Sequence, residues 1–285
     1  FHSPPDAGFI TEYIAPAYEL LRRLPEQPVK LMNLLRKFLL NAGRAMSIGG
    51  IHTPNHRWVV SMALSRIYSL FPDAAFAKRV DEWLAEGIDI NEDGEYTERS
   101  NGYSALSNLS LITIARLRNK PDLLDPVRKN LELALYYLHS NNEIVTEISK
   151  RSDQYQVTDL RRFFYPYYYM AIKDQNPRFA WASDLIKDHT SVSSLLGSLP
   201  HFLEDDFLLR PLPKSERPEN NYLRHFEKTD LIRWRLGDID ISALRDNDVF
   251  FTLHKKQAVL QAIRFASAFF GKGQFIAQTM ELDND

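Results

Sequence analysis

The sequence has no cysteine among its 285 residues, and this absence removes several kinds of chemistry at once. Disulfide bridges, zinc–thiolate sites and a cysteine nucleophile are all excluded. A chain without cysteine is compatible with a reducing or an oxidising compartment, so the absence assigns no localisation. The chain starts at Phe1, without a methionine or a signal peptide, and its first residues do not decide whether the protein is exported.

The sequence also lacks an excess of charge and a long apolar run. Its 35 basic and 37 acidic residues give a net charge of −2, so no general positive field would attract nucleic acid. No apolar stretch approaches the length of a membrane span. We therefore expect neither a nucleic-acid nor a membrane partner, and local basic groups would have to hold any acidic polymer. The oligomeric state is not revealed by composition.

What the sequence does contain, through its first two-thirds, is apolar residues at helical spacing. Thr53 is a favoured N-cap residue and Pro54 suits a first helical turn. The spacing and the helix-stop signals predict helices at residues 10–21, 31–39, 54–70, 74–85, 101–117, 123–138, 161–172 and 179–188.

After about Leu199 the pattern changes to short apolar runs separated by turn signals. Strands are predicted at residues 207–209, 231–235, 249–253 and 258–265, with a turn at Lys255 and Lys256. Helices followed by strands indicate an α+β multidomain chain, with a helical domain at 1–199 and an antiparallel sheet domain at 200–285. The sheet looks unfinished at Asp285, so we expect the native protein to continue.

The helical part fits a bundle, a solenoid or an (α/α) toroid. The absence of a fixed sequence period counts against a regular solenoid. In a toroid the inner helix ends gather at one mouth, and this geometry would bring Asn55 and Tyr103 together.

Two short polar motifs stand where helices are expected to begin. They are TPNHRW at residues 53–58 and DGEYTERSNGY at residues 93–103. A helix start presents unpaired N–H groups and a partial positive charge, which suits an anion such as a carboxylate. An Asn, a His and a Tyr delivered to two such ends predict a site for an acidic substrate, and we interpret the chain as an enzyme acting on a uronic-acid sugar.

These motifs resemble those of the heparinase II/III-like superfamily of polysaccharide lyases, including related alginate lyases. The resemblance covers most of the chain and is carried by residues 55–58, 93–103, 146–154 (TEISKRSDQ) and 263–273 (IRFASAFFGKG). It implies an incomplete (α/α) toroid joined to an antiparallel β-sandwich-type domain. It also implies cleavage of an acidic polysaccharide or oligosaccharide by β-elimination, without a cofactor or a metal.

By the same resemblance, Asn55 and His56 hold the uronate carboxylate and Tyr103 transfers the proton. Tyr103 fits better than Tyr96 because it follows a Ser-x-Gly pattern at a helix start. A further catalytic His often comes from the β-domain, where His225 and His254 are the candidates unless that residue lies beyond Asp285. Substrate contacts are expected from Arg57, Trp58, Tyr96, Glu98, Arg99, Arg151 and Gln154.

Elimination removes the proton at C5 of a uronate, and the negative charge develops on its carboxylate. Donors aimed at that carboxylate are the main electrostatic requirement. Asn55 offers an amide donor and a protonated His56 offers a cation, while a Tyr can exchange a proton if its neighbours lower its pKa. Nearby arginines could have this influence.

Structural interpretations compete with each of these roles. Asn55 and His56 could serve only the helix start, Trp58 could be a buried anchor, and Tyr103 could be a core aromatic. Arg151 and Asp153 could form a plain ion pair. Residues 89–95 resemble half of a calcium loop, but Ser100 stands where a bidentate Glu should close it, so a tight polar loop is the better account.

Two other functions remain open. An (α/α)-toroid glycoside hydrolase would need two carboxylates across the scissile bond, and Asp89, Asp93, Glu95 and Glu98 are available on one loop. A non-catalytic glycan-binding protein would keep the motifs for folding alone. The absorbance of an unsaturated uronate product separates the lyase from both.

Overall fold

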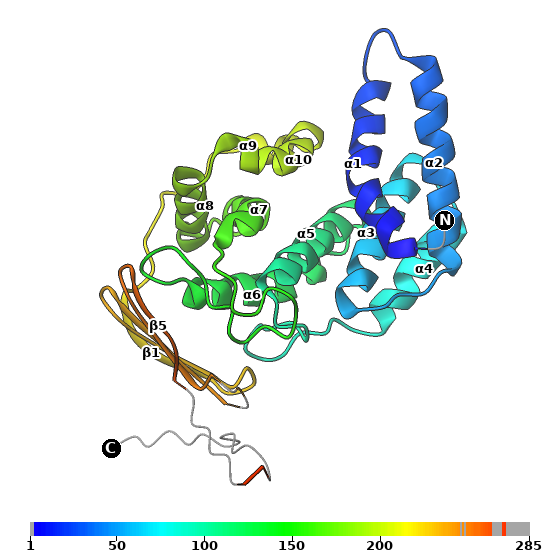
Figure 1. The fold of residues 1–285 in the computed structure, drawn as a ribbon. Helices are drawn as coiled ribbons and strands as arrows, with labels where there is room; N and C mark the ends of the chain where they lie inside the picture. The colour runs from blue at the N-terminus through cyan, green and yellow to red at the C-terminus, as the bar shows by residue number, and fades with distance from the viewer. Residues whose placement is uncertain (1–2, 246, 248, 264–269, 272–285) are drawn as a thin grey trace. The chain divides into compact units, whose positions relative to one another are not determined.

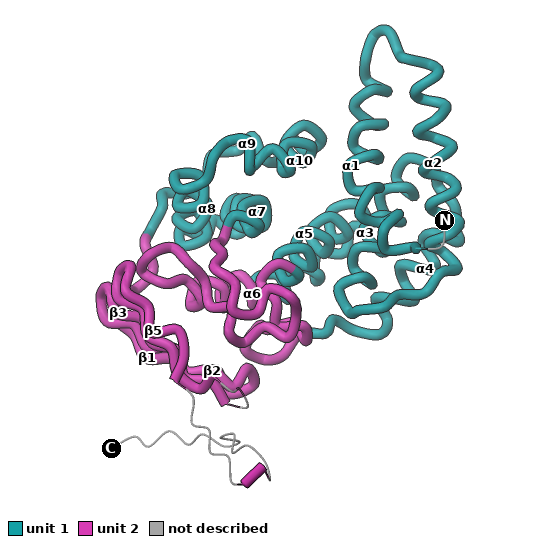
Figure 2. Tube along the Cα trace, in the orientation of Figure 1, with its two compact units in different colours: residues 1–89, 103–128, 161–216 teal, residues 90–102, 129–160, 217–285 magenta. Residues whose placement is uncertain are grey.

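The computed structural model describes residues 3–245, 247, 249–263 and 270–271 (Figure 1). The chain forms two compact units (Figure 2). Unit 1 contains residues 1–89, 103–128 and 161–216, and unit 2 contains residues 90–102, 129–160 and 217–285. This division differs from the expected single boundary after Leu199, because two earlier stretches of chain group with the sheet.

Unit 1 is helical. Its helices are α1 (Pro4–Arg22), α2 (Val29–Ile48), α3 (Pro54–Leu70), α4 (Ala74–Ala85), most of α5 (Asn101–Arg118), the start of α6 (Leu124–Tyr137), α7 (Phe164–Asp174), α8 (Pro177–His189), α9 (Val192–Leu195) and α10 (Leu199–Glu204). Short 3₁₀ helices lie at Pro121–Leu123, Leu160–Phe163, Leu196–Ser198 and Asp206–Leu209. The eight predicted helices are therefore present, and α4 has the predicted bounds.

The apolar core of unit 1 joins helices that are distant in sequence. Side chains of α1 to α4 pack in one cluster with Ile114 of α5, which is fully buried. The α3 contribution is the predicted stripe, including Met62, Ala63 and Ile67. Burial of such a stripe is what stabilises each of these short helices in water.

A buried ion cluster interrupts this core. Arg66 of α3 lies 3.1 Å from Glu12 of α1 and 2.7 Å from Glu204 of α10, measured from guanidinium nitrogen to carboxylate oxygen. His201 lies 3.3 Å from Glu12, and its ring stacks on Tyr165 at 4.1 Å. Every charged group in this cluster therefore has an opposite charge or a polar partner beside it.

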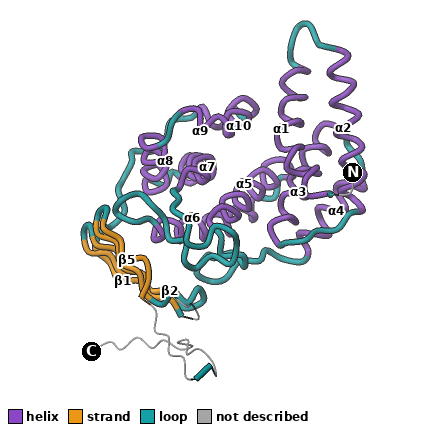
Figure 3. Tube along the Cα trace, in the orientation of Figure 1, coloured by secondary structure: helices purple, strands orange, loops and turns teal. Residues whose placement is uncertain are grey.

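Unit 2 contains a five-stranded antiparallel sheet in the order β1-β2-β3-β4-β5 (Figure 3). The strands are β1 (Asn221–Phe226), β2 (Leu231–Leu236), β3 (Ile239–Leu244), β4 (Phe251–Lys255) and β5 (Ala258–Ile263). Helices in the first part and an antiparallel sheet afterwards confirm the α+β class.

The buried face of this sheet is unusually polar. Two cross-strand rows run over β2, β3 and β4: Arg235, Asp240 and His254 form one, and Arg233, Ser242 and Thr252 form the other. All six side chains are buried. Buried charged and polar side chains need hydrogen-bond or ion-pair partners, so the side chains on this face must find such partners within unit 2.

Some strand predictions were wrong in detail. Residues 207–209, predicted as a strand, belong to the 3₁₀ helix Asp206–Leu209, because the Asp205 carboxylate accepts the N–H of Phe207 at 3.1 Å and caps a turn. The β4–β5 turn lies one residue later than predicted, with Lys256 at a φ of 53°. Of the expected segment 263–273, only Ile263, Phe270 and Gly271 are among the described residues.

Within the described residues, no helix combines the length and the apolar composition needed to cross a membrane.

Candidate functional site

The first motif forms the start of α3. Pro54 is the first helical residue and Thr53 occupies the N-cap position, as predicted. The Thr53 side chain does not cap the helix, because its hydroxyl accepts the Asn55 amide at 3.1 Å. Asn55 is 1% exposed, and His56 is half-buried with its ring edge-on to Phe9 and His52. The motif is therefore a compact polar corner in unit 1.

The next two residues anchor this corner. The Trp58 ring is fully buried, and its indole N–H donates to Asp89 at 2.9 Å. Arg57 lies over that ring and forms ion pairs with Asp89 and Glu86, both at 3.0 Å. The burial of this ring favours the buried-anchor interpretation, and the substrate contact expected from Trp58 stays a prediction. The Arg57 guanidinium is likewise held in a structural ion pair.

Tyr103 is the third residue of α5 and is half-buried. It belongs to unit 1, as do Asn55 and His56. The structure therefore places the three predicted catalytic residues in the first turns of two helices of one unit. Their convergence on one cleft stays a prediction.

The second motif begins as a tight polar loop in unit 2. Gly94 has a φ of 98°, and a Cβ atom there would lie 2.4 Å from the Lys129 carbonyl oxygen, so only glycine fits. Asn130 donates to the Gly94 carbonyl at 2.8 Å. The Asn91 side-chain oxygen accepts the N–H of Glu95 at 2.9 Å. These bonds within the protein support the polar-loop interpretation over a calcium loop.

Glu95 of this loop is an unusual carboxyl group. It is buried and accepts a hydrogen bond from the hydroxyl of Tyr137, near the end of α6. Burial raises the pKa of Glu95 to about 7, although the Tyr137 hydrogen bond and the Arg99 charge oppose the rise. Burial and the Glu95 charge raise the pKa of Tyr137 well above its usual value. The pair can hold a proton at neutral pH.

The second motif and the segment at residues 146–154 lie side by side in unit 2. The Ser100 hydroxyl donates to Asp153 at 2.8 Å, and the Asn101 amide donates to the Val145 carbonyl at 2.6 Å. The N–H of Lys150 donates to the Glu98 carbonyl at 3.3 Å. Two of the segments that carry the sequence resemblance are thus joined by direct hydrogen bonds.

The predicted substrate contacts in unit 2 differ in accessibility. Tyr96 and Glu98 are buried, and Glu98 lies 3.6 Å from Arg151. Arg99, at a φ of 51°, donates to the Thr229 carbonyl at 3.0 Å. Gln154 donates to the Glu147 carbonyl at 3.1 Å, and the Arg151 side chain is 36% exposed. Burial favours a framework role for Tyr96 and Glu98, and substrate contacts from all five residues stay a prediction.

Beneath the sheet, Arg233 is fully buried. It donates to the Tyr136 carbonyl at 2.8 Å and to the Ser242 hydroxyl at 2.7 Å, and it lies 3.7 Å from Asp240. Asp240 also accepts the N–H of Ser140 at 2.7 Å. These contacts hold the polar sheet face against the end of α6.

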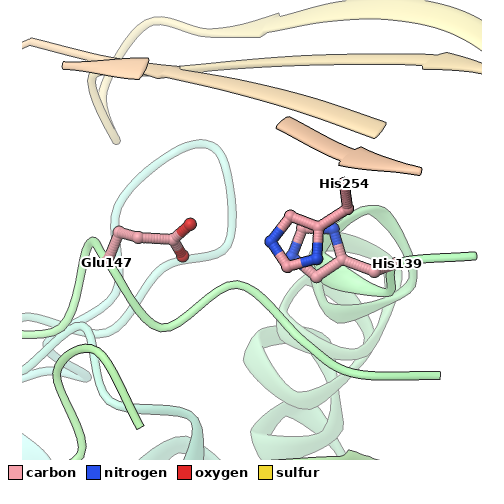
Figure 4. Close-up of side chains that lie close together, drawn as sticks. All are labelled: His139, Glu147 and His254. Carbon is pink, nitrogen blue, oxygen red and sulfur yellow. The ribbon is translucent and has the colours of Figure 1, made fainter. Parts of the chain in front are cut away.

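His139, Glu147 and His254 form a second buried group beside this arginine (Figure 4). The two imidazole rings stack at 3.7 Å, and one nitrogen of each ring turns toward the Glu147 carboxylate. The three potential ligand atoms lie within 4.8 Å of one another. Burial lowers the pKa of both histidines, and the Arg233 charge adds to the effect at His139.

Only one residue of this group, His254, was predicted from the sequence as a candidate site residue. His254 was one of two candidates from the sheet, whereas His139 and Glu147 were not proposed as a pair with it. The only local signal is that His139 directly follows an apolar helix and Glu147 lies in the 146–154 segment.

Comparison of the chain with protein-family models, curated proteins and solved structures gives no match.

Proposed function

We propose that this protein is a polysaccharide lyase that cleaves a uronic-acid glycan by β-elimination. In this proposal the helices of unit 1 form part of an (α/α) toroid, and the sheet of unit 2 begins a β-sandwich-type domain. Asn55 and His56 neutralise the substrate carboxylate, and Tyr103 transfers the proton. The sequence resemblance is the reason for choosing this reaction.

The position of Asn55 and Tyr103 is the observation that supports this proposal best. Each lies in the first turn of a helix, and both helices contribute to one apolar core. In the proposed toroid, inner helix ends gather at one mouth, where the dipoles of two helix starts favour an anion.

Each side chain has a defined task in this arrangement. Asn55 is 1% exposed, so the first turn of α3 must open before its amide exchanges its bond to Thr53 for one to the carboxylate of the substrate. This bond strengthens as charge develops on that group in the transition state. Tyr103 removes the C5 proton or returns it to the leaving oxygen, and both roles need its hydroxyl.

The test measures unsaturated uronate by its ultraviolet absorbance on alginate, heparan sulfate, hyaluronan and chondroitin. Tyr103→Phe keeps the ring, so stability and binding should be preserved while turnover falls by roughly 10²-fold or more. Asn55→Ala should weaken both binding and turnover. Tyr13→Phe is the matched control, because Tyr13 is exposed on α1 and should retain wild-type turnover.

Absence of the absorbance on all four glycans would contradict the proposal. Normal turnover in folded Tyr103→Phe would instead remove Tyr103 from the mechanism and make the second-motif Tyr96 the next residue to test.

A glycoside hydrolase is a second candidate, favoured by Glu95. A carboxyl that keeps its proton near neutral pH is what a general acid requires. Reducing ends without ultraviolet absorbance, lost in Glu95→Gln, would support this alternative. Glycan binding without turnover would support a non-catalytic role.

A further inference from the structure

We propose that His139, Glu147 and His254 bind one divalent transition-metal ion of the zinc type. His139 lies two residues after the end of α6, Glu147 lies further along the same connecting segment, and His254 lies on β4, all within unit 2. The proposal does not depend on the reaction that the protein catalyses.

The geometry suits a metal ion. Zinc is bound at about 2.0–2.2 Å by imidazole nitrogen and carboxylate oxygen, so its ligand atoms lie within roughly 4 Å of one another. The three atoms here are already within 4.8 Å, and the ring nitrogens and the carboxylate face each other (Figure 4). The two rings are stacked with an angle of 12° between their planes, and an imidazole lone pair lies in its ring plane, so binding one ion also requires at least one ring to rotate out of the stack.

Unsatisfied polar atoms mark the same place. Glu147 is 2% exposed, and one of its carboxylate oxygens has no hydrogen-bond donor among the described residues. The other oxygen accepts the N–H of Thr146 at 2.8 Å. A buried carboxylate oxygen without a partner is costly, and a cation would supply the missing partner. Nδ1 of His254 is a second such atom, 4.0 Å from the Glu143 carboxylate.

The local charge accommodates a cation. Arg233 and Arg235 face this region, and both lie within 3.7 Å of Asp240. With Glu147 and Glu143 included, three carboxylates lie in this region against the two arginines. A divalent ion leaves one positive charge, which a hydroxide or another anion in a fourth position would cancel.

Neutral imidazoles are the form that binds metal. Nδ1 of His139 lies 3.5 Å from Arg233, so its Nε2 is the nitrogen available to the ion. Binding there moves the ring proton to Nδ1. The arginine tolerates this change, because the contact is long and the same guanidinium nitrogen lies 3.4 Å from the Leu138 carbonyl oxygen.

The ligand set also selects the ion. Two imidazoles and one carboxylate are a common set for zinc with one open position, whereas calcium and magnesium prefer oxygen ligands. We therefore expect zinc or cobalt to bind and magnesium not to bind. A bound ion would join the end of α6, the 144–149 loop and β4.

The experiment uses the full chain, stripped with a chelator and dialysed against zinc, cobalt or magnesium. One equivalent of zinc should bind per chain. The melting temperature should rise by about 5 °C or more at a hundredfold excess over Kd, because only the folded state contains the assembled site. Cobalt should give the absorption spectrum of a tetrahedral nitrogen–oxygen site, and magnesium should change nothing.

Substitution of the proposed ligands and of control histidines identifies where the ion binds. Glu147→Gln keeps the side-chain shape and should lose most of the zinc-dependent rise, as should His254→Gln. His225→Gln and His201→Gln should retain it, since His225 is exposed on β1 and His201 is buried in unit 1. Circular dichroism checks that each variant is folded.

Failure of the stripped wild type to bind zinc would overturn the proposal. So would zinc binding that is unchanged in both Glu147→Gln and His254→Gln, because the ion would then lie elsewhere.

Discussion

Each unit of the molecule contains a buried arginine, and the two arginines differ in the partners that surround them. In unit 1, Arg66 lies between two carboxylates, those of Glu12 and Glu204. In unit 2, Arg233 shares a single carboxylate with Arg235, and neutral carbonyl and hydroxyl groups supply its hydrogen bonds. In the first cluster the arginine is paired with charged carboxylates, and in the second most of its hydrogen bonds are to neutral dipoles.

The histidines follow the same division. His201 contacts both carboxylates of the unit 1 cluster, and none of the buried unpartnered atoms among the described residues belongs to Arg66, Glu12, Glu204 or His201. In unit 2, His139 and His254 stack on each other, while Glu147 keeps an unpartnered oxygen. Similar residue types therefore give a closed structural cluster in one unit and an open one in the other. A ligand that supplies the missing partner of such a buried oxygen would stabilise the folded state.

Removal of Arg66 should have the largest effect. Arg66→Met leaves Glu12 and Glu204 buried without their main counter-charge, so the free energy of unfolding should fall by about 3–5 kcal/mol. Urea unfolding at neutral pH measures it. Arg22→Met is the control, because the exposed Arg22–Glu19 pair should contribute less than about 1 kcal/mol. A loss below that level in Arg66→Met would show that the closed cluster is not a stabilising element.

Acid should weaken the unit 1 cluster. Burial alone would raise the pKa of Glu204, but the His201 contact and the charges of Arg66 and Arg116 hold this pKa at about 2, below its usual value of 4.5. A lowered pKa stabilises the folded state above the unfolded value, and this contribution is lost as pH falls from about 4.5 to 2. The loss should approach about 3 kcal/mol.

Denaturant unfolding across that range measures the effect, with Glu204→Gln as the comparison. The variant should start less stable at neutral pH and lose less stability on acidification. Parallel acid limbs for the two proteins would contradict the assignment.

The opposite slope is expected from Glu95 in unit 2, and it should be the smallest of these effects. Its pKa is raised to about 7, so its contribution to stability is complete below the unfolded value and is lost as pH rises through 7. Between about pH 5 and pH 8 the free energy of unfolding should fall by about 2 kcal/mol from this group.

Glu95→Gln removes the titrating group and keeps its size, so the decline over this interval should flatten. A decline of unchanged steepness in Glu95→Gln would mean that another buried group titrates there.

Helix bounds were predicted well from the sequence where residues next to the helix, such as a capping side chain, determine them. Asp73 caps α4 through its side chain, and the helix has the predicted bounds. Residues 207–209 were mistaken for a strand because an apolar run of three does not distinguish a strand from a capped turn. Strand β1 was missed because its residues are largely polar and exposed.

The candidate sites show the same limit. Asn55 and Tyr103 were placed at helix starts from capping and proline signals, and both are there. The cluster of His139, Glu147 and His254 depends on a register that pairs β4 with β3 and on a loop packed beneath the sheet. No local pattern encodes a contact between residues separated by about a hundred positions.

The division of unit 2 into three stretches of chain has a consequence during synthesis. Tyr137, His139 and Glu147 leave the ribosome before Arg233, Asp240 and His254, which follow about a hundred residues later. At about 5–20 residues per second, that delay is roughly 5–20 s. For this interval the nascent chain carries polar groups that have no sheet to cover them, while α1 to α4 of unit 1 can already pack together.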